Sequence, residues 1–298
     1  MKKANTNIAA SIRARLINIA EEGKRDYNAI LRLYFQERFL YRLSISAYKQ
    51  KLILKGALLL MMKDISKFRP TKDVDFLGKE ITNEMDECIN VIKEIASIDC
   101  GDGVEFVVDK ISAEKIKEEE EYEGVRIHLP YRMDTIKGYF SIDIGFGDII
   151  VEGPYEMEYP VMLDFPSPNI LVYSMESAVA EKFEAIVKLN FVTSRMKDFF
   201  DIIYIAERTG FNKTALKAAI ITTFRNRGTN TEDRLMIYED NFKMNVQKQI
   251  QWTSFLRRTN LTAENIFAEV VTKISTFIEP VFNSDAENNW NSKKWKWE

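Results

Sequence analysis

The composition of the sequence changes near residue 150, and this change constrains the fold more than any other feature. Between residues 51 and 150, short segments rich in β-branched and aromatic residues alternate with polar stretches, which is typical of β-strands joined by turns. Residues 151–170 then hold four of the seven prolines, as expected for an extended linker. Residues 175–280 carry apolar side chains at helical spacing almost throughout. The pattern predicts an α+β chain, with a mixed β-sheet core and flanking helices followed by a mostly helical C-terminal domain.

Helices are also expected ahead of the sheet. Residues 8–19 have apolar side chains at helical spacing, and Gly23 is a suitable C-cap. The next helix, "YNAILRLYFQERFLYRLSIS", carries Arg38 and Arg42 four positions apart, so that both project from one face. We interpret these arginines as exposed on the helix surface, with phosphate binding as the alternative.

The predicted organisation has four parts. N-terminal helices (1–50) pack on an α/β domain (51–165), which is followed by a helical domain (166–285) and a polar tail (286–298). The tail holds three of the four tryptophans. It is either a mobile end or a docking segment, and the sequence does not decide between the two.

Composition argues against several classes of protein. Of the 298 residues, 46 % are hydrophobic and 29 % are charged, which is ordinary for a soluble globular protein. No apolar run approaches the ~20 residues needed to cross a bilayer, and polar residues interrupt any signal-peptide core. We therefore expect a cytoplasmic protein without a membrane partner. Cys88 and Cys100 are too few for a disulfide scaffold or a thiolate metal site.

His128 is the single histidine, and it lies in a predicted strand with no serine or cysteine nucleophile suggested nearby. We expect a structural role for it. A metal site built on several histidines is excluded within this chain, so any metal site must rest mainly on carboxylates. Their oxygen atoms favour Mg²⁺, Mn²⁺ or Ca²⁺ over Zn²⁺. The net charge of −3 gives no global attraction to nucleic acid, although a local basic surface is compatible with it.

The stretch "RPTKDVDF" (69–76) offers such carboxylates. It follows "KLILKGALLLMM", where we expect a strand at 52–54, a turn at Gly56 and a buried helix at 57–63. Asp73 and Asp75 lie two residues apart in the next predicted strand, so they share a face with α-carbons about 7 Å apart. Two carboxylates this close repel each other unless a cation or water intervenes. The pair is either a metal site or the solvated face of an ordinary strand.

Two further features favour the metal site. In "GYFSIDIGF", Ser141 and Asp143 alternate with apolar residues, which places Asp143 on the polar face of another strand. If the two strands are neighbours, three carboxylates converge, and such a cluster can hold two divalent cations on a nucleoside triphosphate. Gly56 ends one strand and opens a helix, leaving backbone N–H groups for a phosphate. The alternative is three solvent-facing strand residues.

In the helical half, the informative stretch is "MESAVAEKFEAIVKLNFVTSRMKDFFDI". One helix carries Lys182 on its flank, and Ser194 is the expected N-cap of the next helix. Asp198 and Asp201 suit the start of that helix because acidic side chains there interact favourably with the helix dipole. Arg195 does not, which suggests that it faces an anion or a carboxylate.

These motifs resemble the AbiEii/AbiGii toxin family of nucleotidyltransferases, within the DNA polymerase β-like superfamily. The resemblance is carried, in family order over about residues 8–260, by "ERFLYRLSIS", "LKGALLLM", "RPTKDVDFLG", "YEGVRIHLP", "IDIGFGD", "AEKFEAIVKLN" and "SRMKDFFDI". It implies a nucleotidyltransferase-like sheet core. One position departs from the superfamily pattern: Gly56-Ala57 stands where Gly-Ser or Gly-Gly is usual, so backbone N–H groups must replace the missing hydroxyl.

The resemblance also implies the residues of the site. The implied metal ligands are Asp73, Asp75 and Asp143, and the implied catalytic residues are these three with Lys182 and Asp198. The implied nucleotide-binding residues are Lys55, Gly56, Ala57, Thr71, Lys182, Lys188, Arg195 and Lys197.

We accordingly expect a nucleotidyltransferase that uses Mg²⁺ or Mn²⁺ and a nucleoside triphosphate (NTP). The resemblance implies the toxin of a type IV toxin–antitoxin or phage-defence (abortive infection) system, with its antitoxin encoded nearby and tRNA or another RNA as acceptor. One alternative is an enzyme that places a nucleotide or a phosphate on a protein hydroxyl. The other is a non-catalytic nucleotide-binding partner protein.

Overall fold

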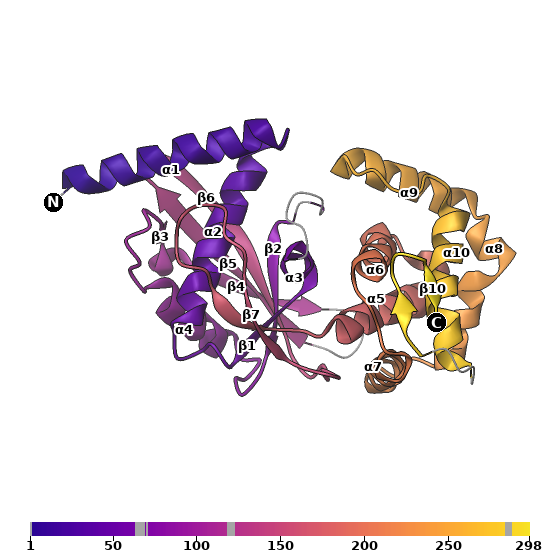
Figure 1. Cartoon of the computed structure of the whole chain (residues 1–298). Coiled ribbons are helices and arrows are strands. Elements are labelled where there is room, and N and C mark those ends of the chain that lie inside the picture. Colours follow the sequence, from indigo (N-terminus) through magenta and orange to yellow (C-terminus); the bar gives the residue numbers. More distant parts are fainter. Residues whose placement is uncertain (1, 63–68, 70, 118–122, 284–287) are drawn as a thin grey trace. The chain divides into compact units, whose positions relative to one another are not determined.

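The computed structural model describes residues 2–62, 69, 71–117, 123–283 and 288–298. The chain divides into two compact units (Figure 1). Unit 1 comprises Met1–Gly147 and Tyr155–Val172, and unit 2 comprises Asp148–Pro154 and Tyr173–Glu298. The change from mixed to helical structure therefore falls where the composition changes.

Unit 1 contains a sheet, two helices that precede its first strand in the sequence, and shorter helices that connect its strands. Its helices are α1 (Lys2–Glu22), α2 (Tyr27–Ser44), α3 (Gly56–Met61), α4 (Met85–Ala96) and the 3₁₀ turn η1 (Val108–Lys110). Its strands are β1 (Leu52–Lys55), β2 (Asp73–Gly78), β3 (Glu105–Phe106), β4 (Ser112–Lys117), β5 (Glu123–Met133), β6 (Ile136–Gly145), β7 (Tyr155–Glu158) and β8 (Asn169–Val172).

The strands form one mixed sheet in the order β3-β5-β6-β2-β1-β8-β7, with β4 also paired to β5. The pairs β2–β6 and β1–β8 are parallel, and the other pairs are antiparallel. This arrangement confirms the predicted α+β class with a mixed sheet core.

The central strands of this sheet have one apolar and one polar face. Val74 and Phe76 of β2 and Ile142 of β6 are fully buried, and polar residues alternate with them as the sequence predicts. Helix α2 packs on the apolar face, where the ring of Phe39 lies 6.4 Å from that of Phe76 and 6.0 Å from that of Phe140. The polar side chains therefore lie on the opposite face of the sheet.

The two arginines of α2 lie in the core, and the prediction that they are exposed was wrong. Arg38 and Arg42 have 0 % and 1 % of their surface exposed. Arg42 donates two hydrogen bonds to the carboxylate of Asp102, at 2.8 and 2.9 Å. Arg38 pairs with Glu37 at 3.0 Å and donates to the carbonyl oxygen of Pro166. Both guanidinium groups thus serve as buried, paired charges that tie α2 to the surrounding loops.

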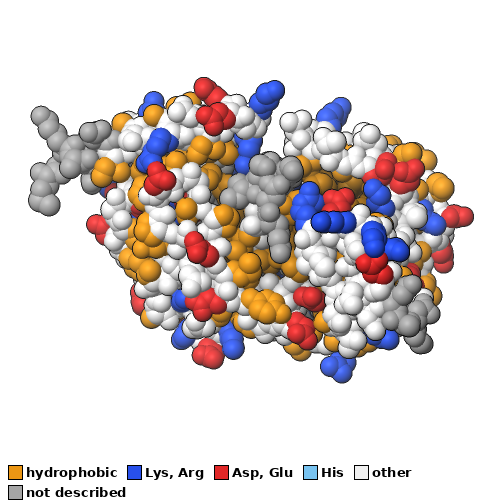
Figure 2. All heavy atoms as spheres, in the orientation of Figure 1, with side chains coloured by type: hydrophobic (Ala, Val, Ile, Leu, Met, Phe, Trp, Pro, Cys, Tyr) orange, Lys and Arg blue, Asp and Glu red, His pale blue; other side chains and the backbone are white. Residues whose placement is uncertain are grey.

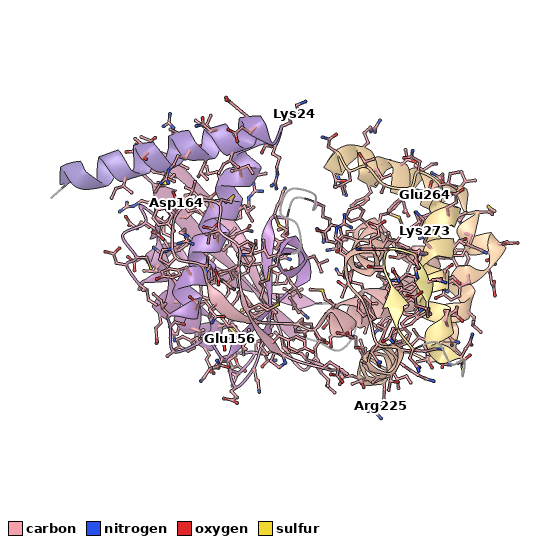
Figure 3. The ribbon with its side chains drawn as sticks, in the orientation of Figure 1. Lys24, Glu156, Asp164, Arg225, Glu264 and Lys273 are labelled. Carbon is pink, nitrogen blue, oxygen red and sulfur yellow. The ribbon has the colours of Figure 1, made fainter. Side chains whose placement is uncertain are left out.

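The proline-rich segment is not a linker, because it contains β7 and β8. These two strands pair with each other, and β8 continues the sheet beside β1. Glu156 of β7, labelled in Figure 3, accepts hydrogen bonds from Lys49 and from Asn169 of β8. Proline lacks an N–H group and is tolerated in connections, and three of the prolines lie between the two strands: Pro160, Pro166 and Pro168.

Unit 2 is almost entirely helical. It contains α5 (Met175–Leu189), η2 (Asn190–Val192), α6 (Met196–Arg208), α7 (Lys213–Asn226), η3 (Thr231–Tyr238), α8 (Asp240–Lys243), α9 (Val246–Thr259), α10 (Phe267–Ile278) and η4 (Glu279–Phe282). Its core holds aromatic contacts such as Phe183–Phe224 at 5.7 Å and Phe199–Phe267 at 5.1 Å. The helical half predicted from the sequence is confirmed.

The start of α6 differs from the prediction. The N-cap residue is Arg195 rather than Ser194, and no side chain caps the helix. Instead, the carbonyl oxygen of Ser194 accepts a hydrogen bond from the N–H of Met196, and the hydroxyl of Thr193 accepts one from the N–H of Arg195.

The described end of the chain is a docked hairpin of β9 (Trp290–Asn291) and β10 (Lys296–Trp297). The indole N–H of Trp290 donates to the carbonyl oxygen of Ala206, and that of Trp297 donates to the carbonyl oxygen of Phe277. Both indoles are buried. Two of the three tryptophans that the sequence places in the polar tail, Trp290 and Trp297, therefore extend the core of unit 2.

Two further observations concern the cysteines and the apolar character of the helices. Cys88 is buried, Cys100 is half-buried, and both are free thiols. Among the helices of the described residues, none is both long enough and apolar enough to span a membrane.

Candidate functional site

Three aspartates of unit 1, Asp73, Asp75 and Asp143, lie on the polar face of β2 and β6. The parallel register places Asp73 opposite Ser141 and Asp75 opposite Asp143. Asp73 and Asp75 share this face because they are two residues apart, and adjacent strands lie only about 4.8 Å apart. The prediction of an acidic cluster required these two strands to be neighbours, and they are.

Gly56 makes room for the carboxylate of Asp75. Its φ is +68°, and a Cβ at this position would lie 2.0 Å from Oδ2 and 2.6 Å from Cγ of Asp75. Glycine alone adopts this conformation at little cost and leaves that space. The sequence predicted a turn at Gly56, and the structure adds a direct contact with a predicted site residue.

Arg126 of β5, which sequence analysis did not single out, binds Asp143. Its Nε and Nη2 atoms donate to the two carboxylate oxygens at 2.8 and 2.6 Å. This hydrogen bonding raises the pKa of Arg126 above its usual value, burial opposes the effect, and the charges of Asp143 and Asp73 add to it. The sequence signal was the alternation of Arg126 with Val125 and Ile127, which indicates the polar face but not the partner.

His128 lies two residues further along β5, opposite Ser141. Its Nδ1 atom is 3.3 Å from the hydroxyl of Ser141, and its Nε2 atom is 3.4 Å from Glu114. A serine therefore does lie beside the histidine, which the sequence did not suggest. Because Ser141 is only 8 % exposed, these contacts link three strands and suit the expected structural role.

The donor atoms on this face suit a hard divalent cation. The carboxylate oxygens of Asp73, Asp75 and Asp143 are the ligands that Mg²⁺ and Mn²⁺ prefer, and Asp75 lies in a space that a Cβ at Gly56 would fill. Within the part of the chain that the structure describes, no three carboxylate, imidazole or thiolate groups are grouped so as to hold a metal ion. The three carboxylates fit a metal in chemical type and share one face of the sheet, and Asp143 is engaged by Arg126. Their metal role stays a prediction.

Three more of the predicted nucleotide-binding residues belong to unit 1, and the structure gives each a different place. Lys55 is opposite Asp75 in the β1–β2 pair, and its Nζ atom is 3.6 Å from the position that a Cβ of Gly145 would occupy. The hydroxyl of Thr71 donates to the carbonyl oxygen of Asp73 at 3.3 Å. Ala57 is buried within α3. Lys55 is thus placed near the carboxylates, whereas Thr71 supports the start of β2.

In unit 2, the predicted basic and acidic residues form one network between α5 and α6. Lys182 Nζ lies 2.7 Å from Asp201 and 3.5 Å from Asp198, and Arg195 Nε donates to Asp198 at 2.7 Å. Asp198 and Asp201 are 1 % and 0 % exposed. Buried carboxylates require such partners, which gives the network a structural role. The contacts of Lys182 and Arg195 with nucleotide stay predictions.

Asp201 is the member of this network that the predicted site omitted. The sequence explained it by the helix dipole alone, and its partner Lys182 comes from the preceding helix.

Lys188 and Lys197, also predicted to bind nucleotide, are exposed. On the visible face of the molecule, basic side chains gather with acidic ones among them (Figure 2), in keeping with the small net charge of −3.

Comparisons with known proteins identify a family and a structure of similar fold. The family model "Nucleotidyl transferase AbiEii toxin, Type IV TA system" matches residues 38–276. A crystal structure from H. pylori, of a protein provisionally described as a nucleotidyltransferase, is similar in fold with a TM-score of 0.51 and 14 % identity, covering 86 % of this chain and 95 % of that chain. The crystal structure of JHP933 from Helicobacter pylori aligns with a TM-score of 0.41 and 14 % identity, over 79 % of this chain and 96 % of that chain. The search of curated proteins found no match.

The family match includes the acidic face of unit 1 and the network of α5 and α6. The similarity in fold to the first H. pylori structure confirms the nucleotidyltransferase-like architecture. As its motifs predicted, the chain belongs to the family of AbiEii nucleotidyl transferase toxins of type IV toxin–antitoxin systems.

Proposed function

We propose that this chain transfers a nucleoside monophosphate from an NTP to the 3′ end of a tRNA, with Mg²⁺ or Mn²⁺ held by Asp73, Asp75 and Asp143. The observation that carries the proposal is the parallel register of β2 and β6, which puts Asp75 beside Asp143. Phosphoryl-group transfer depends on positioning and on electrostatic stabilisation of the triphosphate. Carboxylate side chains on one face of a sheet would provide the fixed framework that this requires.

The residues have distinct roles in this mechanism. Bound divalent ions would neutralise triphosphate charge as the reaction proceeds. Asp143 accepts the proton of the attacking hydroxyl, a bond forms between that oxygen and the α-phosphorus, and the bond to the bridging oxygen breaks to release pyrophosphate. For Lys182 and Arg195 we propose phosphate binding, as the family resemblance implies.

The other predicted nucleotide contacts have supporting roles. Lys55, which lies near the carboxylates, is placed to contact the triphosphate, together with the backbone of Gly56 and Ala57. Exposed Lys188 and Lys197 supply positive charge for phosphate groups.

The family match gives this activity its biological setting. A type IV toxin implies an antitoxin partner, and we propose that it is encoded nearby and that the pair acts in phage defence by abortive infection. The cytoplasm, where tRNA and NTPs are abundant, is the proposed location.

Labelled nucleotides test the proposed acceptor. The purified chain is incubated with Mg²⁺, a cell extract and each of the four α-labelled NTPs, and RNA and protein are then separated. Label is expected in the tRNA fraction, and periodate treatment of the tRNA should block it because periodate destroys the terminal diol. Label in protein instead would identify the alternative protein-modifying enzyme. Saturable nucleotide binding without release of pyrophosphate would identify a non-catalytic nucleotide-binding protein.

A further inference from the structure

Arg126 occupies the carboxylate of Asp143, which is the group that a metal ion would bind. Its guanidinium group spans both carboxylate oxygens at 2.8 and 2.6 Å, which is the strong bidentate arrangement. The side chain of Arg126 is 35 % exposed and that of Asp143 is 18 % exposed. Solvent therefore reaches both partners of the ion pair, which is not buried in the core.

A divalent cation and this guanidinium group compete for the same carboxylate. Asp143 has lone pairs to spare, but an ion bound to them would lie close to a second positive charge. Because like charges repel at short range in a partly buried site, the guanidinium must move away when the ion binds.

Glu114, whose carboxylate lies 3.4 Å from the Nε2 atom of His128, offers Arg126 a second partner. It lies directly opposite Arg126 in the antiparallel β4–β5 pair, and 60 % of its side chain is exposed. Opposite charges on directly paired strand residues attract each other. Arg126 thus lies between two carboxylates, Asp143 on β6 and Glu114 on β4.

We propose that Arg126 is the resident counter-ion of Asp143 and moves to Glu114 when a divalent cation binds. The strength of the Arg126–Asp143 ion pair then sets the concentration of divalent cation at which Asp143 becomes a metal ligand. Arg126 acts through Asp143 and is a positioning residue, not a catalytic one. This inference rests on the proposed function, because it takes Asp143 as a metal ligand.

Metal binding in the absence of nucleotide tests the proposal. Mn²⁺ is titrated into the full chain, and free Mn²⁺ is followed by electron paramagnetic resonance. Arg126→Gln is expected to bind Mn²⁺ roughly fivefold more tightly than the wild type, or better, since coupling energies of this kind are typically at least that large. The matched control is Arg132→Gln, which removes another β5 arginine that is 52 % exposed and paired with Glu105. It should leave the affinity unchanged.

Glu114→Gln gives an independent readout on an exposed residue, where misfolding is not expected. It should weaken Mn²⁺ binding by roughly twofold, as expected for an exposed ion pair. Equal or weaker binding by folded Arg126→Gln overturns the proposal, as does unchanged or tighter binding by Glu114→Gln. If Asp73→Asn leaves wild-type Mn²⁺ affinity intact, the proposed metal site itself fails. If Asp73→Asn weakens Mn²⁺ binding but Arg126→Gln does not tighten it, only the proposed role of Arg126 is overturned.

Discussion

Asp73→Asn is expected to lower nucleotide transfer by roughly 10²–10³-fold or more, a loss typical of removing a group that stabilises transition-state charge. Asparagine has nearly the same shape as aspartate but lacks the negative charge needed to hold a divalent cation. Asp73 is half-buried on the polar side of β2, whereas Val74 beside it packs in the core. The fold should therefore survive, with an unchanged melting temperature by circular dichroism.

The matched control is Asp109→Asn, the same chemical change at an exposed position in η1. It should retain full transfer in the labelled-nucleotide assay. Transfer by Asp73→Asn at the level of this control would contradict the mechanism.

Gly56→Ala is expected to have the second largest effect, because it acts on Asp75 through space. The new methyl group would lie 2.0 Å from the carboxylate oxygen of Asp75, and the three closest atoms all belong to that side chain. Asp75 must therefore move away from its position opposite Asp143. We expect roughly a 10²-fold loss of transfer from the displaced carboxylate and a loss of about 1–3 kcal/mol in unfolding free energy.

Gly101→Ala separates the clash from backbone strain. Gly101 also has a positive φ, +62°, but no atom of the described residues lies within 4 Å of the position that a Cβ there would occupy. It should cost only the strain, about 1 kcal/mol, and keep full activity. Chemical denaturation and the transfer assay compare the two variants. If Gly56→Ala matches Gly101→Ala in both, the contact with Asp75 has no functional importance.

Much of the acidic face followed from the period of the strands. Alternation of polar and apolar residues placed Asp73 and Asp75 on one face and Asp143 on the polar face of a second strand. The sequence could not show that these strands are neighbours, because about 60 residues separate them and pairing of distant strands depends on the whole sheet. The family resemblance supplied that step, and the register of β2 and β6 now shows it.

The errors at the α2 arginines and in the proline-rich segment share one physical cause, which is that pattern analysis treats each segment alone. Arg38 and Arg42 have the spacing of exposed helix residues, yet they are buried because Glu37, Asp102 and the carbonyl oxygen of Pro166 pair with them. Proline content concealed the short strands β7 and β8, which are stabilised by β1 and by each other. Partners from distant segments decide both cases.

Arg126 was missed for the same reason. Its position on the polar face of a strand was readable, but its partner Asp143 lies 17 residues away on the next strand. The hairpin of Trp290 and Trp297 could not be assigned either, since its stability comes from carbonyl groups of α6 and α10 that accept the indole hydrogen bonds.

Crystals of the chain soaked with Mn²⁺ and a non-hydrolysable NTP test the central claim most directly. The account predicts an anomalous scattering peak coordinated by Asp73 and Asp75, with Asp143 as the third carboxylate and the triphosphate bound to the same ion. A nucleotide bound with its metal at other residues, while these three carboxylates contact only protein and water, would contradict it.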